Sequence, residues 1–171
     1  MRRIGLLLVA IAALPAAVGG APASPEQPDD AAISAGKLPA GYRDWRLISI
    51  AHEEGDLHSI GAVLGNDVAI KAFREAKLPF PDGAIIAALH YRHVPSEEND
   101  KVFGRPQSFV AGPPTNVQFM VKDSTKYATT GGWRFAHFVN GKPAADDAML
   151  QACFACHKAA SRDLVFTKYA P

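Results

Sequence analysis

Cysteine is scarce in this sequence, since its 171 residues include only Cys153 and Cys156. Two cysteines separated by two residues close too small a loop for a disulfide to add much stability. A structural zinc site would need a second cysteine pair or paired histidines, and no further cysteine exists to supply one. A thioredoxin-like redox pair opens a helix early in a βαβ unit, whereas few residues follow the pair here. Each of these three interpretations therefore fits the pair poorly.

Long apolar runs are also missing, and none is long enough to span a membrane. The longest, Ile4–Val18, follows the positively charged start Met1-Arg2-Arg3 and precedes the small-x-small site Ala21-Pro22-Ala23. This order of features is typical of a cleaved secretory signal, here residues 1–23. We therefore expect export to the periplasm and no membrane insertion after cleavage.

Neither sign of charge dominates, because 18 basic residues are balanced by 17 acidic ones and the formal net charge is +1. A domain that binds nucleic acid usually carries a marked basic excess on one face. Nucleic acid is therefore not an expected partner.

The two cysteines are followed at once by a histidine, so that residues 153–157 form the C-x-x-C-H pattern of covalent haem attachment. On a helical turn, residues three apart share a face, where both thiols can reach the two vinyl groups on one edge of a haem. The adjacent imidazole can then take an axial position on the iron. The motif predicts one covalently attached haem c, with Cys153 and Cys156 as its anchors and His157 as the iron ligand.

The composition divides the rest of the chain into a leader and one domain. Residues 24–41 are rich in Pro, Ala, Asp and Gly without periodicity and predict a flexible leader, followed by a domain over residues 42–171. Alternating and apolar stretches predict strands at residues 44–52, 57–64, 84–94, 107–111, 116–121 and 133–139. Helices are expected from the cap Asn66 to Lys77, from Asp123 to Ala128, and after Asp146, with a charged loop at residues 95–104.

These elements predict an α+β fold, because the strands follow one another through tight turns without a regular βαβ alternation. We expect an antiparallel sheet with a few short helices packing around one haem. The haem-attachment motif lies on the last, C-terminal helix.

Several stretches carry a resemblance to the cytochrome P-460 family and its relatives, the beta-type cytochromes c-prime. They are Tyr42-Arg43-Asp44-Trp45, residues 64–69 (LGNDVA), residues 79–83 (PFPDG), residues 119–124 (FMVKDS), Gly132-Trp133, residues 153–157 and residues 163–167 (DLVFT). The resemblance implies a periplasmic mono-haem protein whose haem packs on an antiparallel sheet and whose iron is five-coordinate. In the P-460 branch a lysine is cross-linked to the macrocycle and hydroxylamine is oxidised. In the c-prime beta branch that bond is absent and nitric oxide is bound.

The chain departs from the P-460 pattern in the strand after Pro81-Asp82-Gly83. The cross-linking lysine is expected there, but residues 84–90 contain none, and Ala88 stands at its ungapped position. The missing lysine argues against hydroxylamine oxidation.

Candidates for the opposite side of the haem follow from the same strand. If Ala88 faces the haem, the period of two places His90 on the same face. His90 would then act as a sixth ligand, as a hydrogen-bond donor to bound peroxide or a nitrogen oxide, or only as a partly solvated residue at the end of the sheet. Gln118 is a second distal candidate, whereas Met120 on the same face is better explained as a core residue.

Two functions are compatible with these features. The first is an exported haem protein that binds or turns over nitric oxide, hydroxylamine or peroxide at an open or weakly closed iron. The alternative is a six-coordinate periplasmic electron-transfer cytochrome. Either would need a periplasmic redox partner, and an exposed sheet edge would allow two copies to form a homodimer.

Overall fold

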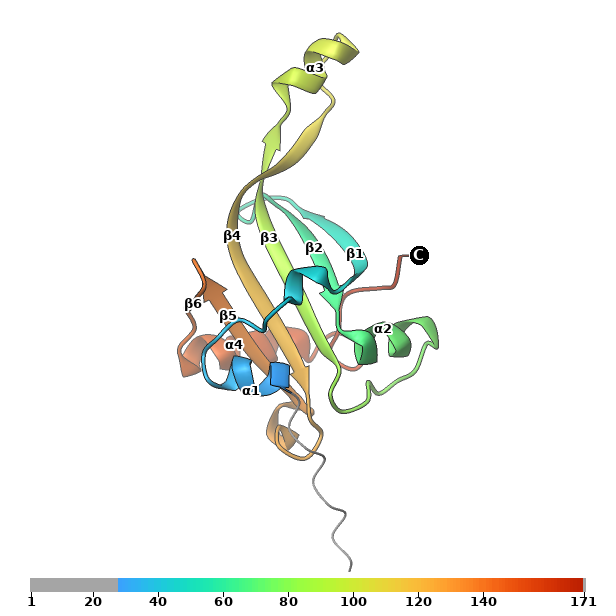
Figure 1. The fold of residues 1–171 in the computed structure, drawn as a ribbon, viewed down its shortest axis with the longest axis vertical. Helices are drawn as coiled ribbons and strands as arrows, with labels where there is room; N and C mark the ends of the chain where they lie inside the picture. Colours follow the sequence, from blue (N-terminus) through green and yellow to red (C-terminus); the bar gives the residue numbers. More distant parts are fainter. Residues whose placement is uncertain (1–27, 171) are drawn as a thin grey trace, which may run out of the picture.

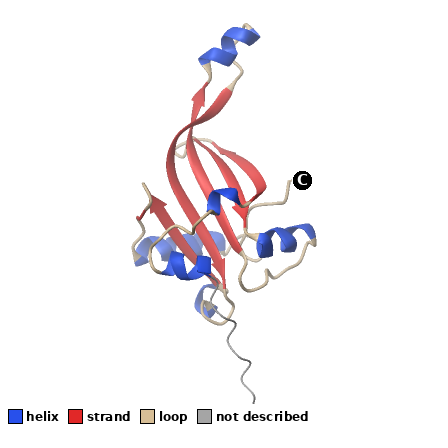
Figure 2. Ribbon diagram, viewed as in Figure 1, coloured by secondary structure: helices blue, strands red, loops and turns tan. Residues whose placement is uncertain are grey.

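A single antiparallel sheet forms the centre of the molecule (Figures 1 and 2). The computed structural model describes residues 28–170, so the signal predicted at residues 1–23 lies outside the described residues. Consecutive strands pair as neighbours, which gives a six-stranded meander and confirms the predicted α+β class. The strands are β1 (Arg46–Glu53), β2 (Ser59–Gly65), β3 (Ile85–Pro95), β4 (Phe109–Lys122), β5 (Trp133–Val139) and β6 (Lys142–Pro143).

The two faces of the sheet are both apolar, and β3 shows how its sequence divides between them. Ile85 and Ala87 belong to one buried cluster, whereas Ile86 packs in the other, with Ala88 against it. Successive side chains of a strand point to opposite faces, so each face takes every second residue. As predicted, Ala88 therefore shares a face with Ile86.

The helix that precedes β3 and the last helix of the domain each begin with a side-chain cap. Asn66 caps α2 (Asp67–Arg74) and accepts the Ala69 N–H at 3.0 Å. Asp146 caps α4 (Asp147–His157) and accepts the Met149 N–H at 2.8 Å. Such caps satisfy amide donors that the first helical turn leaves free. Both caps were predicted, although α2 ends at Arg74 rather than at Lys77.

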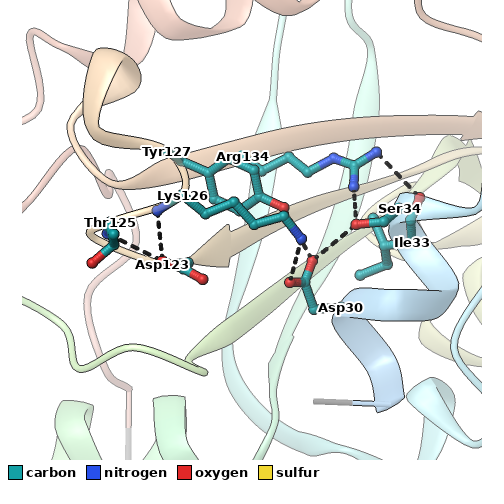
Figure 3. A network of polar contacts seen from close by, with 8 residues as sticks. All are labelled: Asp30, Ile33, Ser34, Asp123, Thr125, Lys126, Tyr127 and Arg134. Carbon is teal, nitrogen blue, oxygen red and sulfur yellow. Dashed lines mark hydrogen bonds and ion pairs between the residues drawn. The ribbon is translucent and has the colours of Figure 1, made fainter. Parts of the chain in front are cut away.

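The flexible leader predicted at residues 24–41 is wrong for its described part, which begins with α1 (Pro28–Ser34). Ile33 is 1% exposed and packs on the sheet face opposite α4. Asp30, 6% exposed, accepts hydrogen bonds from Lys126 and Tyr127, and Arg134 donates to Ser34 (Figure 3). Composition alone missed this helix because its single buried isoleucine creates no periodic pattern.

A long arm formed by the distal parts of β3 and β4 extends from the sheet, with α3 (Glu97–Phe103) at its tip (Figure 1). This helix replaces the loop predicted at residues 95–104. The two strands predicted at 107–111 and 116–121 are one continuous strand, β4, because irregular pairing near Tyr91 accommodates Pro114. Turns and a short 3-10 helix at Ala128–Thr130 replace the helix predicted from Asp123 to Ala128.

Candidate haem site

A cavity of about 550 Å³ lies against the sheet face that packs on α4. Its volume falls within the range of pockets that hold cofactors and small molecules. All five long strands contribute to the wall, as do α4 and the segment after it. The lining includes Ser49, Ala51, Glu53, Val63, Ile86, Ala88, His90, Gln118, Met120, Phe135, His137, Met149, Cys153, His157, Val165, Phe166, Thr167 and Lys168.

Helix α4 carries the C-x-x-C-H motif, as the sequence predicts. Cys153 and His157 line the cavity, which follows from their spacing, since residues four apart share one face of a helix. Cys156 is exposed and lies outside the lining, and both thiols are free. Burial raises the pKa of the Cys153 thiol, and neighbouring Cys156 adds to the rise against an opposing backbone hydrogen bond. The two anchor candidates therefore differ in environment.

The imidazole of His157 is held by one hydrogen bond and two aromatic rings. Its Nδ1 lies 2.8 Å from the carbonyl oxygen of Leu164. Because a carbonyl can only accept, Nδ1 carries a proton, and in the neutral imidazole Nε2 then holds the lone pair that a metal needs. The rings of Phe135 and Phe166 lie 5.0 and 5.1 Å from the imidazole. A hydrogen bond from the second ring nitrogen to a carbonyl is the usual way in which a metal-binding histidine is oriented.

The sheet wall of the cavity contains both distal candidates from the sequence. Ala88 pairs with Gln118, and Gln118 pairs with His137, so the three form one row across β3, β4 and β5. His90 lies two residues beyond Ala88 and lines the same cavity. The structure thus brings His90 and Gln118 together with Ala88.

Two polar residues of this wall, Glu53 and His137, were not predicted. Burial, with a smaller contribution from His137, lowers the pKa of His90, while Glu53 opposes the shift. Burial also lowers the pKa of His137, whose Nε2 is buried without a hydrogen-bond partner among the described residues. Both imidazoles are therefore neutral near pH 7. His137 could have been noticed from its position two residues after Phe135 on the aromatic strand.

These observations fit a haem c: two free thiols three residues apart, a histidine with a free Nε2, and a cavity with mainly apolar walls beside them. The family model of cytochrome P460 matches residues 39–167. The chain belongs to the cytochrome P460 family. It is therefore a haem c cytochrome. None of the curated proteins compared with the chain matches it.

In this member of the P460 family, Ala88 gives the cavity wall a methyl group. Lys168 is the lysine that lines the cavity among the described residues, and it is exposed and lies on the segment after α4. Lys122, another lysine of the matched region, is 4% exposed and bonded to Asp163. The β3 wall therefore presents no lysine amine to the cavity.

Three further histidines gather away from the cavity. The ring of His93 lies 4.1 Å from that of His52 and 5.4 Å from that of His58, and it stacks on Phe109 at 4.3 Å. No spacing in the sequence predicts this cluster. Within residues 28–170, no group of three or more histidine, cysteine or acidic side chains is arranged to hold a metal ion, and no helix has the length and apolar character to cross a membrane.

Proposed function

We propose that this P460-family protein is an exported mono-haem c cytochrome that binds or turns over a small nitrogen or oxygen species at an iron held by His157. The observation that carries the proposal is the bond from His157 Nδ1 to the Leu164 carbonyl, because it leaves Nε2 free to ligate. When bound, the haem would supply an iron able to take nitric oxide, hydroxylamine or peroxide. Cys153 and Cys156 would hold it through thioether bonds.

The wall of the cavity supports ligand binding through two kinds of side chain. Ile86, Met120 and Phe135 are 4%, 8% and 6% exposed and exclude water from one part of it. His90 and Gln118 add polar groups in another part, and the amide nitrogen of Gln118 also donates to Asn116 Oδ1 at 3.1 Å. Because His90 is neutral near pH 7, one of its ring nitrogens carries an N–H and the other a lone pair, so it can either donate to a small ligand or accept from one. Apolar enclosure with a few polar groups suits a diatomic or similarly small molecule.

Ala88 favours binding over hydroxylamine oxidation. The P-460 branch attaches a lysine to the macrocycle, whereas Ala88 offers only a methyl group to the cavity. Nitric oxide or peroxide is accordingly the ligand class that we favour. Hydroxylamine is the weaker member of the proposed set.

Electron transfer is the second candidate, and His137 is the observation in its favour. This residue lines the cavity, is neutral near pH 7 and has a buried Nε2 without a partner among the described residues. A neutral imidazole is a good iron ligand. If His137 or His90 occupied the sixth position, the protein would carry electrons and exclude added ligands.

Absorption spectra of the ferric and ferrous protein, before and after addition of nitric oxide, separate the two functions. We expect high-spin spectra that change on addition. Low-spin spectra in both redox states, unaffected by nitric oxide, would overturn the proposal. In that case His137→Gln or His90→Gln should restore a high-spin spectrum, while His58→Gln, outside the cavity, should not.

Location and partners are part of the same proposal. The signal pattern at residues 1–23 supports export, so fractionation should find the mature chain, starting near Ser24, in the periplasm. A periplasmic redox partner would deliver or remove electrons. Size-exclusion chromatography should test whether two copies pair as a homodimer.

A further inference from the structure

A buried ion pair lies behind the segment that holds His157. Lys122 is 4% exposed, and its Nζ lies 3.0 Å from both carboxylate oxygens of Asp163. The same Nζ donates to the Gly131 carbonyl at 3.1 Å and lies 5.0 Å from the centre of the Trp133 ring. A buried charge is tolerated when it is paired and hydrogen-bonded, and here both conditions are met.

Asp163 joins this pair to a second element. Its Oδ2 accepts the backbone N–H of Phe80 at 2.8 Å, so the carboxylate fixes the loop before β3 as well as the end of β4. Asp163 and Leu164 have φ values of 53° and 66°, in the left-handed region that non-glycine residues seldom adopt. Two successive residues in this region persist where surrounding contacts hold them.

The carbonyl that accepts from His157 belongs to this constrained turn. Leu164 follows Asp163 directly, and its oxygen lies 2.8 Å from His157 Nδ1. Val165, the next residue, is 3% exposed and packs in the core cluster of the cavity face. The ion pair and the core therefore fix the carbonyl from both sides.

We propose that Lys122 and Asp163 are positioning residues for the iron ligand: their ion pair locks the turn that aims the Leu164 carbonyl at His157 Nδ1. This inference rests on the proposed function, since it assumes that His157 ligates a haem iron. Neither side chain lines the cavity, so both act through the Leu164 carbonyl.

The consequence follows from how a hydrogen bond affects an imidazole ligand. A well-aimed acceptor on Nδ1 draws the N–H proton, raises the basicity of Nε2 and fixes the plane of the ring. A more basic axial ligand stabilises ferric over ferrous iron, so the reduction potential is lowered. Loosening the Leu164 carbonyl should raise the potential and weaken the iron–histidine bond.

The test compares holoproteins carrying Asp163→Asn and Lys122→Met with the wild type. Asparagine tolerates the left-handed conformation, so Asp163→Asn removes the charge while sparing the backbone. Asp82→Asn is the matched control, because Asp82 also anchors a loop, through the Ser124 N–H at 2.7 Å and its hydroxyl at 2.8 Å, without touching the turn.

We expect Asp163→Asn and Lys122→Met each to raise the reduction potential and to lower the ferrous iron–histidine stretching frequency. Asp82→Asn should keep the wild-type value of both quantities. Unchanged values in the pair variants would overturn the positioning role, even if their stability falls. The iron–histidine stretching frequency of the wild type is a further test that needs no variant. A value typical of a histidine without a Nδ1 acceptor would also overturn the positioning role. A wild type without covalent haem would refute the proposed function itself.

Discussion

Asn66 offers the sharpest test of how the fold sets the β3 wall of the cavity. Its Oδ1 accepts the N–H groups of Ala69 and Ile85, both at 3.0 Å, and its Nδ2 donates to the Gly83 carbonyl at 2.8 Å. One side chain thus starts α2 and fixes the beginning of β3. Further along the same strand, Ala88 faces the cavity.

The expected cost of Asn66→Ala can be worked out from these three bonds. Loss of an N-cap costs about 1 kcal/mol. Ile85 is fully buried, so its N–H would be left without an acceptor, at a cost of about 1–3 kcal/mol. The Gly83 carbonyl loses its donor for about 1 kcal/mol more. We expect the free energy of unfolding to fall by about 3–5 kcal/mol.

Urea denaturation of the holoprotein, followed by circular dichroism, measures this change. Asn66→Asp keeps the Oδ1 acceptor but replaces the donor to Gly83 by a carboxylate oxygen, which cannot donate and repels that carbonyl. It should therefore lose about 1 kcal/mol for the missing bond and somewhat more for the repulsion, still less than Asn66→Ala. Ser96→Ala is the matched control, because Ser96 caps the exposed α3 through a single 3.4 Å bond and should change little. If Asn66→Ala were no worse than Ser96→Ala, Asn66 would not join the two elements.

Two further predictions concern other parts of the fold. Ile33→Ala should lower the free energy of unfolding by about 2–5 kcal/mol without altering the haem spectrum, since Ile33 is 1% exposed on the face opposite the cavity. An unchanged urea midpoint would mean that residues 28–34 do not stabilise the domain. Burial lowers the pKa of His93. The neighbouring His52 and His58 lower this pKa further, whereas Glu54 opposes the shift. The folded state then binds fewer protons than the unfolded state, so stability should be lost as the pH falls below about 6.5. Thermal melts from pH 8 to pH 5 should show this loss reduced in His93→Phe, and an identical pH profile would contradict it.

Local chemistry accounts for what the sequence predicts well. The caps Asn66 and Asp146 are recognisable because a short polar side chain before a helix satisfies nearby amides. The strand period placed Ala88 and His90 on one face without knowledge of the partner strands. The haem motif needs only spacing along one helix, so Cys153 and His157 were found in the same way.

Features that depend on distant pairing could not be predicted. Ile33 is buried by a sheet face formed from residues far along the chain, so α1 was mistaken for a leader. Glu53 and His137 reach the cavity only through the registers of β1 with β2 and of β4 with β5. The Lys122–Asp163 pair joins positions 41 residues apart, and its role depends on the left-handed turn at Leu164.

The central claim is that Cys153 and Cys156 hold one haem c beside His157. The intact mass of the purified, denatured protein tests it most directly. The account predicts the mass of the mature chain plus one haem, with no further loss of hydrogen from a third covalent bond at a lysine. The mass of the bare chain, with or without the two hydrogens lost in a disulfide, would contradict it.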